Sequence, residues 1–303
     1  MAKKKIKRTS QLERILIVIL AFTLSISLIL FLVRVVLGMF VGSDTTESST
    51  DEKTEEKISI FKDSKKKKLT EEQQNRVDAY RKENPDLSEE DAINQVLMNL
   101  DLEPYSITNI IEDDSDMTLL VNKYNAMPEG YIPDDLVDIN YVCEIGVDYS
   151  CTTMDRVQLR KEAAKAYEEF CEAAAKEGLN IVAIAAYRSY EYQAGLWSYY
   201  ADLNGQEYAD EYYARPGQSE HNTGLAVDIS FNGYNFNEIE NYEGYDWILE
   251  NMPKYGFILR YPENKVDIHR YGYESWHFRY VGKEAAKKCV ENNWTLEEYT
   301  INK

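Results

Sequence analysis

An uninterrupted apolar stretch lies near the start of the chain. Residues 15–33 have the sequence ILIVILAFTLSISLILFLV, without a charged side chain. A helix needs about 20 consecutive apolar residues to cross the hydrocarbon core of a bilayer. Lysine and arginine dominate residues 1–14, whereas acidic residues are frequent after the stretch, and this bias predicts a cytoplasmic N-terminus. We therefore expect a basic cytoplasmic tail at 1–14 and a transmembrane signal-anchor at 15–41.

A cleaved signal peptide is the alternative interpretation of this stretch. Such peptides have an apolar region of about 7–15 residues that ends in a small-x-small cleavage site. The stretch in this chain is longer, and no such site follows it. The pattern therefore favours the uncleaved anchor.

The next segments have fewer apolar positions. Residues 42–69 are rich in Ser, Thr, Asp, Glu and Lys. This composition buries too little apolar surface to fold, so we expect a disordered stalk. Helical spacing follows, and Ser88 is a predicted N-cap with acidic residues directly after it. These features predict a short helical lead-in over residues 70–116.

Residues 117–303 contain the apolar segments expected of a cored domain. Apolar positions recur at helical spacing over 159–177, a buried strand is predicted at 181–186, and a helix is predicted at 189–203. Helices and strands without regular alternation predict an α+β domain with a small mixed sheet flanked by helices. The remaining predicted elements are strands at 226–230, 257–260 and 276–280 and helices at 245–252 and 283–292.

Charge and cysteine content narrow the classes of function. The chain has 303 residues, with 34 Lys+Arg against 53 Asp+Glu and a formal net charge of -19. Such acidity excludes nucleic acid as an expected partner, because phosphate binding needs clustered basic residues. Cysteines exported from the cytoplasm can oxidise. The 4 cysteines allow three pairings, one of which joins Cys143 to Cys151 and Cys171 to Cys289, and the sequence does not choose among them.

Two short segments concentrate the residues that are rare in this chain. They are SEHNTGLAVD at 219–228 and ESWHFR at 274–279, and together they hold two of the 3 histidines. Two imidazoles and one carboxylate suit zinc, with a fourth position left for water. The segments therefore predict His221, Asp228 and His277 as metal ligands, although histidines beside acids are more often surface or core residues.

Glu274 is the predicted general base of this site. A carboxylate beside a catalytic metal can take a proton from water as the water attacks a carbonyl. On an ideal strand Glu274 and His277 would point to opposite faces of the sheet. We therefore expect a bend or bulge between them.

These motifs resemble those of a known enzyme family. SEHNTGLAVD matches the SxHxxGxAxD pattern of the zinc-dependent D-alanyl-D-alanine carboxypeptidases, and ESWHFRYVG resembles their ExWHxRYVG segment. Further matches lie at 120–137, 185–193 and 214–221, so the similarity spans residues 118–290. The chain resembles the VanY-like branch, which includes L,D-carboxypeptidases of bacterial cell-wall remodelling. The resemblance implies the fold of the hedgehog and DD-peptidase zinc peptidases.

The resemblance also implies roles for individual residues. It implies one zinc ion on His221, Asp228 and His277, with Glu274 activating the water and Arg188 stabilising the oxyanion. Gln193 and Ser219 match positions that line the family's substrate pocket, while Tyr187 and Trp276 are expected to form its walls, although both also suit a core. His269 stands where many relatives carry the first residue of a Thr-Gly pair, and we expect it to be a rim or packing residue.

The sequence therefore predicts a membrane-anchored zinc metallocarboxypeptidase that removes C-terminal D-alanine from peptidoglycan stem peptides. We expect a single-pass protein in the membrane of a Gram-positive bacterium, with its catalytic domain outside. D,D, L,D and endopeptidase specificity stay open, as does the oligomeric state. The alternatives are a peptidoglycan-binding or sensory domain without turnover, which the presence of Glu274 and Arg188 disfavours, and a closed structural zinc or calcium domain.

Overall fold

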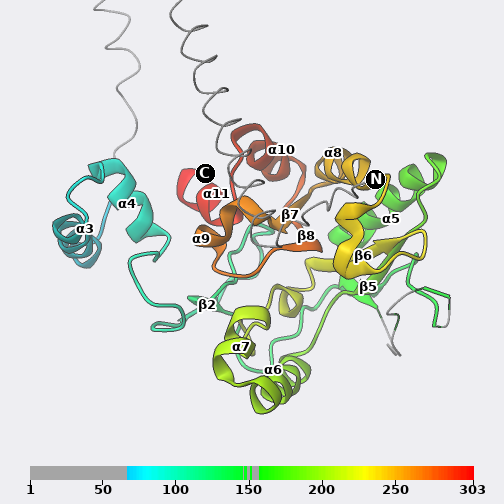
Figure 1. The fold of residues 1–303 in the computed structure, drawn as a ribbon, viewed down its shortest axis with the longest axis horizontal. Helices are drawn as coiled ribbons and strands as arrows, with labels where there is room; N and C mark the ends of the chain where they lie inside the picture. Colours follow the sequence, from blue (N-terminus) through cyan, green and yellow to red (C-terminus); the bar gives the residue numbers. More distant parts are fainter. Residues whose placement is uncertain (1–66, 146, 149–150, 152–156) are drawn as a thin grey trace, which may run out of the picture. The chain divides into compact units, whose positions relative to one another are not determined.

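The computed structural model describes residues 67–145, 147–148, 151 and 157–303 (Figure 1). Within these residues, Lys68–Lys303 form one unit. The predicted cytoplasmic tail, the signal-anchor at 15–41 and most of the stalk at 42–69 lie outside the described residues. Among the residues that are described, no helix has the length and apolar character needed to cross a membrane.

An antiparallel sheet forms the centre of this unit. Its strands are β5 (Ile181–Ala185), β6 (Ala226–Phe231), β7 (Phe257–Tyr261) and β8 (Glu274–Tyr280), in the order β5-β6-β8-β7. Each neighbouring pair of strands is antiparallel. A parallel bridge joins Val142 to Ala183 at the β5 edge. The predicted α+β class is confirmed, but the sheet expected to be mixed is antiparallel in all pairings of these four strands.

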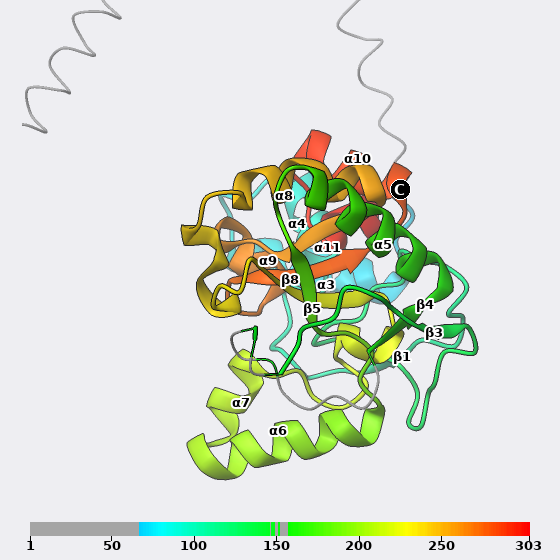
Figure 2. The same ribbon diagram turned by 90° about the vertical axis from the view of Figure 1, so that its right-hand side faces the viewer.

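Helices lie on two sides of the sheet. The helices α5 (Lys161–Lys176), α8 (Tyr245–Asn251) and α10 (Lys283–Asn292) lie on one side, and α6 (Tyr190–Asn204) and α7 (Gln206–Tyr212) lie on the other (Figure 2). The predicted apolar face of α5 is confirmed, because its buried residues join those of β6 and β8 in the principal core. Members of this core include Ala163, Tyr167, Phe170, Val227, Ile229 and Phe278.

Short elements connect these helices and strands. Gln158–Arg160 form strand β4, which pairs with β3 (Leu136–Asp138), so the helix expected to start at 159 begins at Lys161. The other short elements are β1 (Asn109–Ile110), β2 (Asn125–Ala126), α9 (Val266–His269), α11 (Leu296–Asn302) and the 3₁₀ helices η1 (Glu220–Thr223), η2 (Phe236–Asn241), η3 (Met252–Tyr255) and η4 (Glu263–Lys265).

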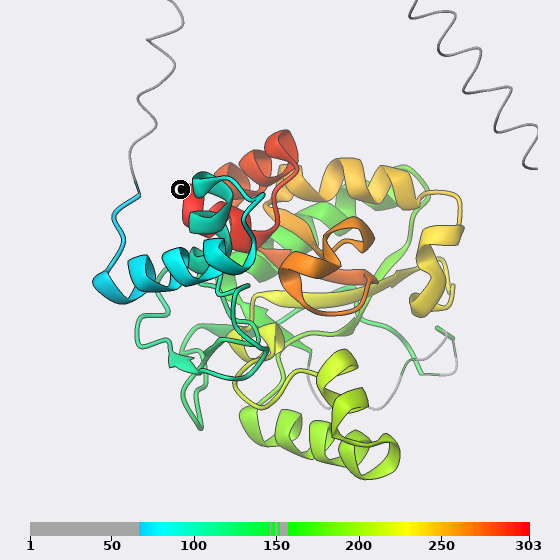
Figure 3. The same ribbon diagram turned by 60° about the vertical axis from the view of Figure 1, so that its left-hand side comes forward.

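The lead-in forms two helices, α3 (Glu71–Glu83) and α4 (Glu89–Leu97), as its pattern predicted. The predicted cap is confirmed, since the Ser88 hydroxyl accepts a hydrogen bond from the backbone N–H of Asp91. Their buried residues Val77, Ala92 and Val96 form a small separate core. Helix α4 contacts α11 near the C-terminus (Figure 3), and Arg270 donates to the carbonyl of Leu100. The lead-in is therefore packed against the rest of the unit.

The cysteines divide into one disulfide and two buried thiols. Cys143 and Cys151 are bonded to each other, which is one of the bridges that the sequence allowed. The other bridge of that possible pairing, Cys171 with Cys289, is not formed, because both side chains are free thiols. Cys171 belongs to the principal core, whereas Cys289 packs in a separate cluster with Ile258 and its neighbours.

Candidate metal centre and active site

Strand register brings two of the predicted metal ligands together. In the β6–β8 pair, Asp228 lies directly opposite His277. Side chains that are directly opposite on antiparallel strands share one face of the sheet and lie within contact distance. The Nδ1 atom of His277 is 2.9 Å from Oδ1 of Asp228. The sheet itself therefore positions this half of the site.

The third predicted ligand, His221, lies in the 3₁₀ helix that precedes β6. Helix η1 ends at Gly224, whose φ of 68° lies in the left-handed region, and a Cβ atom there would lie 2.9 Å from the side chain of Leu136. Glycine meets both demands, and the backbone turns at this position between His221 and Asp228. The turn brings Nε2 of His221 to 3.2 Å from Oδ2 of Asp228.

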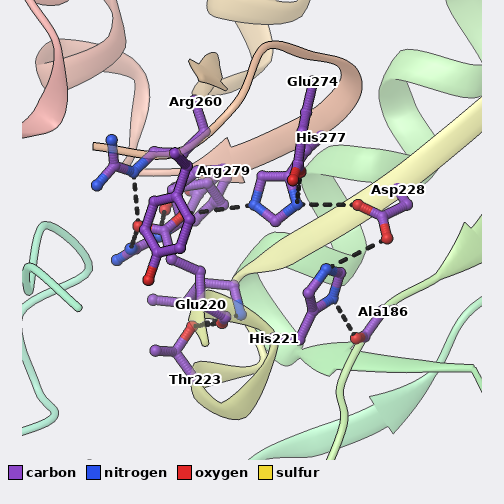
Figure 4. Close-up of polar contacts among 12 residues, drawn as sticks. Ala186, Glu220, His221, Thr223, Asp228, Arg260, Glu274, His277 and Arg279 are labelled. Atoms are coloured by element: carbon purple, nitrogen blue, oxygen red, sulfur yellow. Dashed lines mark hydrogen bonds and ion pairs between the residues drawn. The ribbon is translucent and has the colours of Figure 1, made fainter. Parts of the chain in front are cut away.

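A backbone carbonyl sets the tautomer of His221. Its Nδ1 atom lies 2.7 Å from the carbonyl oxygen of Ala186 (Figure 4). A carbonyl oxygen can only accept, so Nδ1 carries the proton and Nε2 presents its lone pair to the site. Metal-bound histidines are commonly oriented by such a hydrogen bond from the other ring nitrogen.

The donor set fits a zinc ion. One ligand atom each from His221, Asp228 and His277 can be chosen so that the three atoms lie within 4.8 Å of one another, and all three residues are buried. Zinc binds nitrogen and oxygen donors at about 2.0–2.2 Å, and a catalytic zinc site commonly has three protein ligands with a fourth position for water. Two imidazoles and a carboxylate provide such a site.

Burial, neighbouring charges and hydrogen bonds shift the pKa values of the two histidines in opposite directions. Burial, with the positive charge of Arg188, lowers the pKa of His221 to about 4. Burial also opposes the charged form of His277, but hydrogen bonds to Asp228 and Glu220 outweigh it and raise its pKa to about 9. His221 is therefore neutral at pH 7, whereas a metal ion that binds Nδ1 of His277 displaces a proton.

A bulge turns Glu274 toward the metal ligands. Phe278 pairs with Leu259 and Glu274 pairs with Tyr261, so β8 advances further than β7 between these two pairs. The predicted irregularity is confirmed, and Oε2 of Glu274 lies 3.7 Å from Nδ1 of His277 (Figure 4). Burial, helped by repulsion from Asp228 and opposed by attraction to His277, raises the pKa of Glu274 to about 7. A carboxylate with such a pKa is suited to taking and returning a proton at neutral pH.

Arg188 lies beside the metal ligands, between β5 and α6. One of its terminal nitrogens lies 3.0 Å from Oδ2 of Asp228, and its backbone N–H donates to the carbonyl of His221. Its side chain keeps 24% of its surface exposed, whereas that of Asp228 keeps only 7%. The side chain of Arg188 is therefore partly exposed to solvent, whereas the carboxylate that it contacts is almost fully buried.

The four predicted substrate contacts occupy different environments. Gln193 is buried in α6 and donates to the carbonyl of Ala214, while Ser219 is buried at the start of η1. Trp276 packs edge-to-face against Phe236 at 5.3 Å, as a core aromatic would. Among the described residues, the hydroxyl of Tyr187 and Oε1 of Gln193 are buried without a hydrogen-bond partner.

His269 has a packing role. It is buried, its Nδ1 accepts from the backbone N–H of Tyr271, and its Nε2 lies 3.0 Å from the carbonyl of Pro262. Both ring nitrogens are therefore engaged with the backbone. Of the two expectations for His269, the structure supports packing.

Sequence reasoning did not identify Glu220, which lies between Ser219 and His221. Its side chain is fully buried, and its Oε1 accepts from Arg260 and Arg279. Its Oε2 is 3.5 Å from Nε2 of His277. The signal for Glu220 in the sequence was its position inside the histidine motif. This signal is weak, because a glutamate is seldom fully buried without charged partners, and the motif does not show any partner.

An α+β domain that presents two imidazoles, two carboxylates and an arginine at one place has the constituents of a metallohydrolase. Residues 156–283 match the family model VanY, described as D-alanyl-D-alanine carboxypeptidase. The protein YodJ of Bacillus subtilis is 44% identical over 195 residues, which cover 62% of this chain and 68% of YodJ. The chain belongs to the VanY family.

Two further relatives have names that describe an activity. VanXYC of Enterococcus gallinarum, a bifunctional D-Ala-D-Ala dipeptidase and D-Ala-D-Ala carboxypeptidase, is 38% identical over 148 residues, covering 47% of this chain and 77% of VanXYC. The solved structure of the LD-carboxypeptidase LdcB is 40% identical with a TM-score of 0.59, covering 66% of this chain and 96% of that structure. The expected family resemblance is thus confirmed, and the fold with it.

Proposed function

We propose that the chain is a zinc-dependent carboxypeptidase that removes C-terminal D-alanine from peptidoglycan stem peptides. One observation carries the proposal: the ligand atoms of His221, Asp228 and His277 converge within 4.8 Å, and Glu274 lies beside them. Membership of the VanY family makes carboxypeptidase activity the activity to expect from this convergence. A binding domain without turnover would have no need of a carboxylate in the position of Glu274.

The three ligands would hold one zinc ion. When bound, zinc lowers the pKa of a water molecule and polarises the carbonyl of the bond to be cleaved. The fold holds these three side chains in place. Asp228 and His277 are cross-strand neighbours, and the ring of His221 is held by the carbonyl of Ala186. The protein therefore supplies a donor set that needs little rearrangement.

Glu274 is the proposed general base and acid. It takes a proton from the attacking water and then delivers it to the nitrogen of the departing D-alanine. A pKa raised to about 7 allows both steps near neutral pH, because neither protonation state is strongly favoured. General acid–base catalysis of this kind contributes about 10²–10⁴-fold to a rate.

Arg188 is the proposed stabiliser of the developing oxyanion. Its side chain is partly exposed to solvent, and one of its terminal nitrogens lies 3.0 Å from Oδ2 of Asp228. A fixed guanidinium donates hydrogen bonds in a planar fork that suits an oxygen carrying negative charge. The guanidinium of Arg188 would therefore already be in position to donate hydrogen bonds to the negatively charged oxygen.

Two of the predicted substrate contacts receive support from unpaired polar atoms. The hydroxyl of Tyr187 and Oε1 of Gln193 lack partners among the described residues. Buried polar groups normally have partners, and a polar ligand is one means of providing them. Ser219 and Trp276 stay in the proposal as pocket residues on the strength of the family motif.

The substrate class follows from the named relatives. VanXYC acts on D-Ala-D-Ala, and LdcB is an LD-carboxypeptidase. Peptides with a C-terminal D-alanine satisfy both descriptions, so we propose this class for the chain. The test is to incubate the full-length protein with synthetic pentapeptide ending in D-Ala-D-Ala and with tetrapeptide ending in a single D-alanine, following release by mass spectrometry. Chelator-sensitive release from one of them supports the proposal and assigns the specificity, and no release from either contradicts it.

We also propose that residues 15–41 anchor the protein in the membrane of a Gram-positive bacterium, with residues 42–69 as a stalk and the catalytic domain outside. The support is the apolar stretch at 15–33 and the basic residues before it. Cell fractionation tests the anchor. The full-length chain should sediment with membranes and its domain should be digested by protease added to intact protoplasts, and recovery in the cytosol would contradict this arrangement.

A further inference from the structure

Two unpaired atoms face each other behind His277, on the side away from Asp228. They are Nε2 of His277 and Oε2 of Glu220, which lie 3.5 Å apart. Both are buried, and neither has a hydrogen-bond partner among the described residues. The other polar atoms of the two side chains are paired. Nδ1 of His277 forms a hydrogen bond with Asp228, and Oε1 of Glu220 accepts hydrogen bonds from Arg260 and Arg279.

Metal binding by His277 would explain why its Nε2 faces Oε2 of Glu220. A neutral imidazole carries a proton on only one of its two nitrogens. When Nδ1 of His277 gives its lone pair to a metal ion, the proton must lie on Nε2. A buried N–H without an acceptor costs free energy. Oε2 of Glu220 is the acceptor that this N–H faces.

Two arginines hold one oxygen of the Glu220 carboxylate. Nε of Arg260 and a terminal nitrogen of Arg279 lie 2.8 and 2.7 Å from Oε1. Both arginines bind the same oxygen, so Oε2 is left for the histidine.

Glu297 completes a balanced group of buried charges. Both of its oxygens accept from Arg260, at 3.0 and 2.7 Å. The two carboxylates of Glu220 and Glu297 therefore balance the two guanidiniums of Arg260 and Arg279, and all four side chains are at most 1% exposed. Buried ion pairs are often no more stabilising than apolar residues of similar size. A role toward His277 accounts for their presence directly behind a metal ligand.

We propose that Glu220 is a positioning residue of the metal centre, which accepts the Nε2–H of His277 and so presents Nδ1 of that ring to the zinc ion. The inference rests on the proposed function, because it requires a metal at Nδ1. The two histidines are then held by different acceptors, a backbone carbonyl for His221 and a carboxylate for His277. A carboxylate acceptor raises the basicity of the ligating ring, which strengthens metal binding.

The variant Glu220→Gln tests this role. Two arginine donors converge on Oε1, so the amide oxygen of glutamine is expected to take that place and its NH₂ group to face Nε2. An NH₂ donor there favours the ring with its proton on Nδ1, where the metal should bind. Loss of such supporting hydrogen bonds typically weakens metal binding about 10–100-fold, and we expect the zinc dissociation constant to rise by this factor. The measurement is competition with a chromogenic chelator, using the full-length chain in mild detergent.

Glu297→Gln is the matched control. It removes a carboxylate from the same buried group and weakens the hold on Arg260, but Glu297 does not face His277. A general loss of packing or charge balance would weaken zinc binding similarly in both variants. The proposal predicts weakening in Glu220→Gln alone, and equal dissociation constants in the two variants would overturn it.

Nitrogen NMR of the histidine rings tests the proposal without any variant. The chain has 3 histidines, and His269 serves as an internal reference outside the metal centre. In the zinc-loaded wild-type chain, we expect His277 to carry its proton on Nε2 and His221 to carry its proton on Nδ1. A His277 ring that binds zinc through Nε2 would overturn the inference, even if Glu220→Gln failed to fold.

The outcomes also separate this inference from the function on which it rests. A wild-type chain that does not bind zinc contradicts both. A wild-type chain that binds zinc and releases D-alanine, but whose Glu220→Gln variant binds zinc equally well, contradicts only the role of Glu220.

Discussion

The two sides of His277 differ in charge balance and in access to solvent. On the Nδ1 side, Asp228 and Glu274 carry two carboxylates against the single guanidinium of Arg188, and the Glu274 and Arg188 side chains are 20% and 24% exposed. On the Nε2 side, two carboxylates face two guanidiniums, and every one of these side chains is at most 1% exposed.

This difference separates two uses of charged residues. A surplus of carboxylate beside an accessible space attracts a cation, whereas a balanced and closed group has no charge left to offer a ligand. Buried charges without such balance are costly, which is why the closed group pairs each carboxylate with a guanidinium. Substitutions on the open side should therefore change chemistry, and substitutions on the closed side should change stability or the orientation of His277.

The largest effect is expected from Asp228→Ala, on the open side. Asp228 contacts both histidines and Arg188, so its loss removes a metal ligand and frees the arginine. We expect D-alanine release to fall to background and zinc content to fall well below one ion per chain. Elemental analysis and mass spectrometry of the same sample check this. Full zinc content in the variant would contradict the assignment of Asp228 as a ligand.

Glu274→Gln should separate chemistry from metal binding. Glutamine keeps the shape of the side chain but cannot take a proton, so kcat should fall about 10²–10⁴-fold. Zinc content should stay at the wild-type level, because Glu274 is not one of the three ligands. Preserved turnover would refute the role of Glu274 as base.

Arg279→Met tests the closed side. It removes one partner from a buried ion pair, and such a change typically costs about 3–5 kcal/mol of the free energy of unfolding. Denaturant unfolding of the wild-type and variant chains measures this. Lys287→Met is the control, since it breaks an exposed pair of 3.8 Å with Glu291 and should cost less than about 1 kcal/mol. Equal losses in the two variants would contradict the distinction between closed and exposed charges.

The smallest effect is expected for His269→Gln, in the pH dependence of the free energy of unfolding. Burial lowers the pKa of His269 below the ordinary value of 6.5. Between the lowered pKa and 6.5, the unfolded chain binds more protons than the folded chain, so the free energy of unfolding falls as pH falls through this window. Glutamine does not titrate in this range, so the variant lacks the contribution of His269. Its loss of stability from pH 7.5 to 5.5 should therefore be smaller than that of the wild type. A larger loss in the variant would contradict the direction of the shift.

Local pattern predicted those features that depend on neighbouring residues in the chain. The α5 and α6 helices, the strands of the main sheet and the histidine motif are each encoded within one contiguous segment. The bulge in β8 also followed from local geometry, because Glu274 and His277 could not otherwise face the same site. These predictions needed no knowledge of which segments meet in space.

Features that depend on distant partners were beyond local pattern. Glu220 is buried in a group with Arg260, Arg279 and Glu297, which lie on three other elements. The sequence around Glu220 does not indicate that these residues will be its neighbours. The separation of Cys171 from Cys289 likewise depends on α5 and α10 packing in different clusters. Cys143 and Cys151, by contrast, are only 8 residues apart, and their bridge was among the possible pairings.

The central claim is that one zinc ion, held by His221, Asp228 and His277, is required for release of D-alanine. The most direct measurement is to strip the full-length chain of metal and titrate zinc back while recording D-alanine release. The account predicts that activity rises in proportion to zinc and stops rising at one ion per chain. Full activity in the stripped chain, or no release from either peptide when one zinc ion is bound, would contradict it.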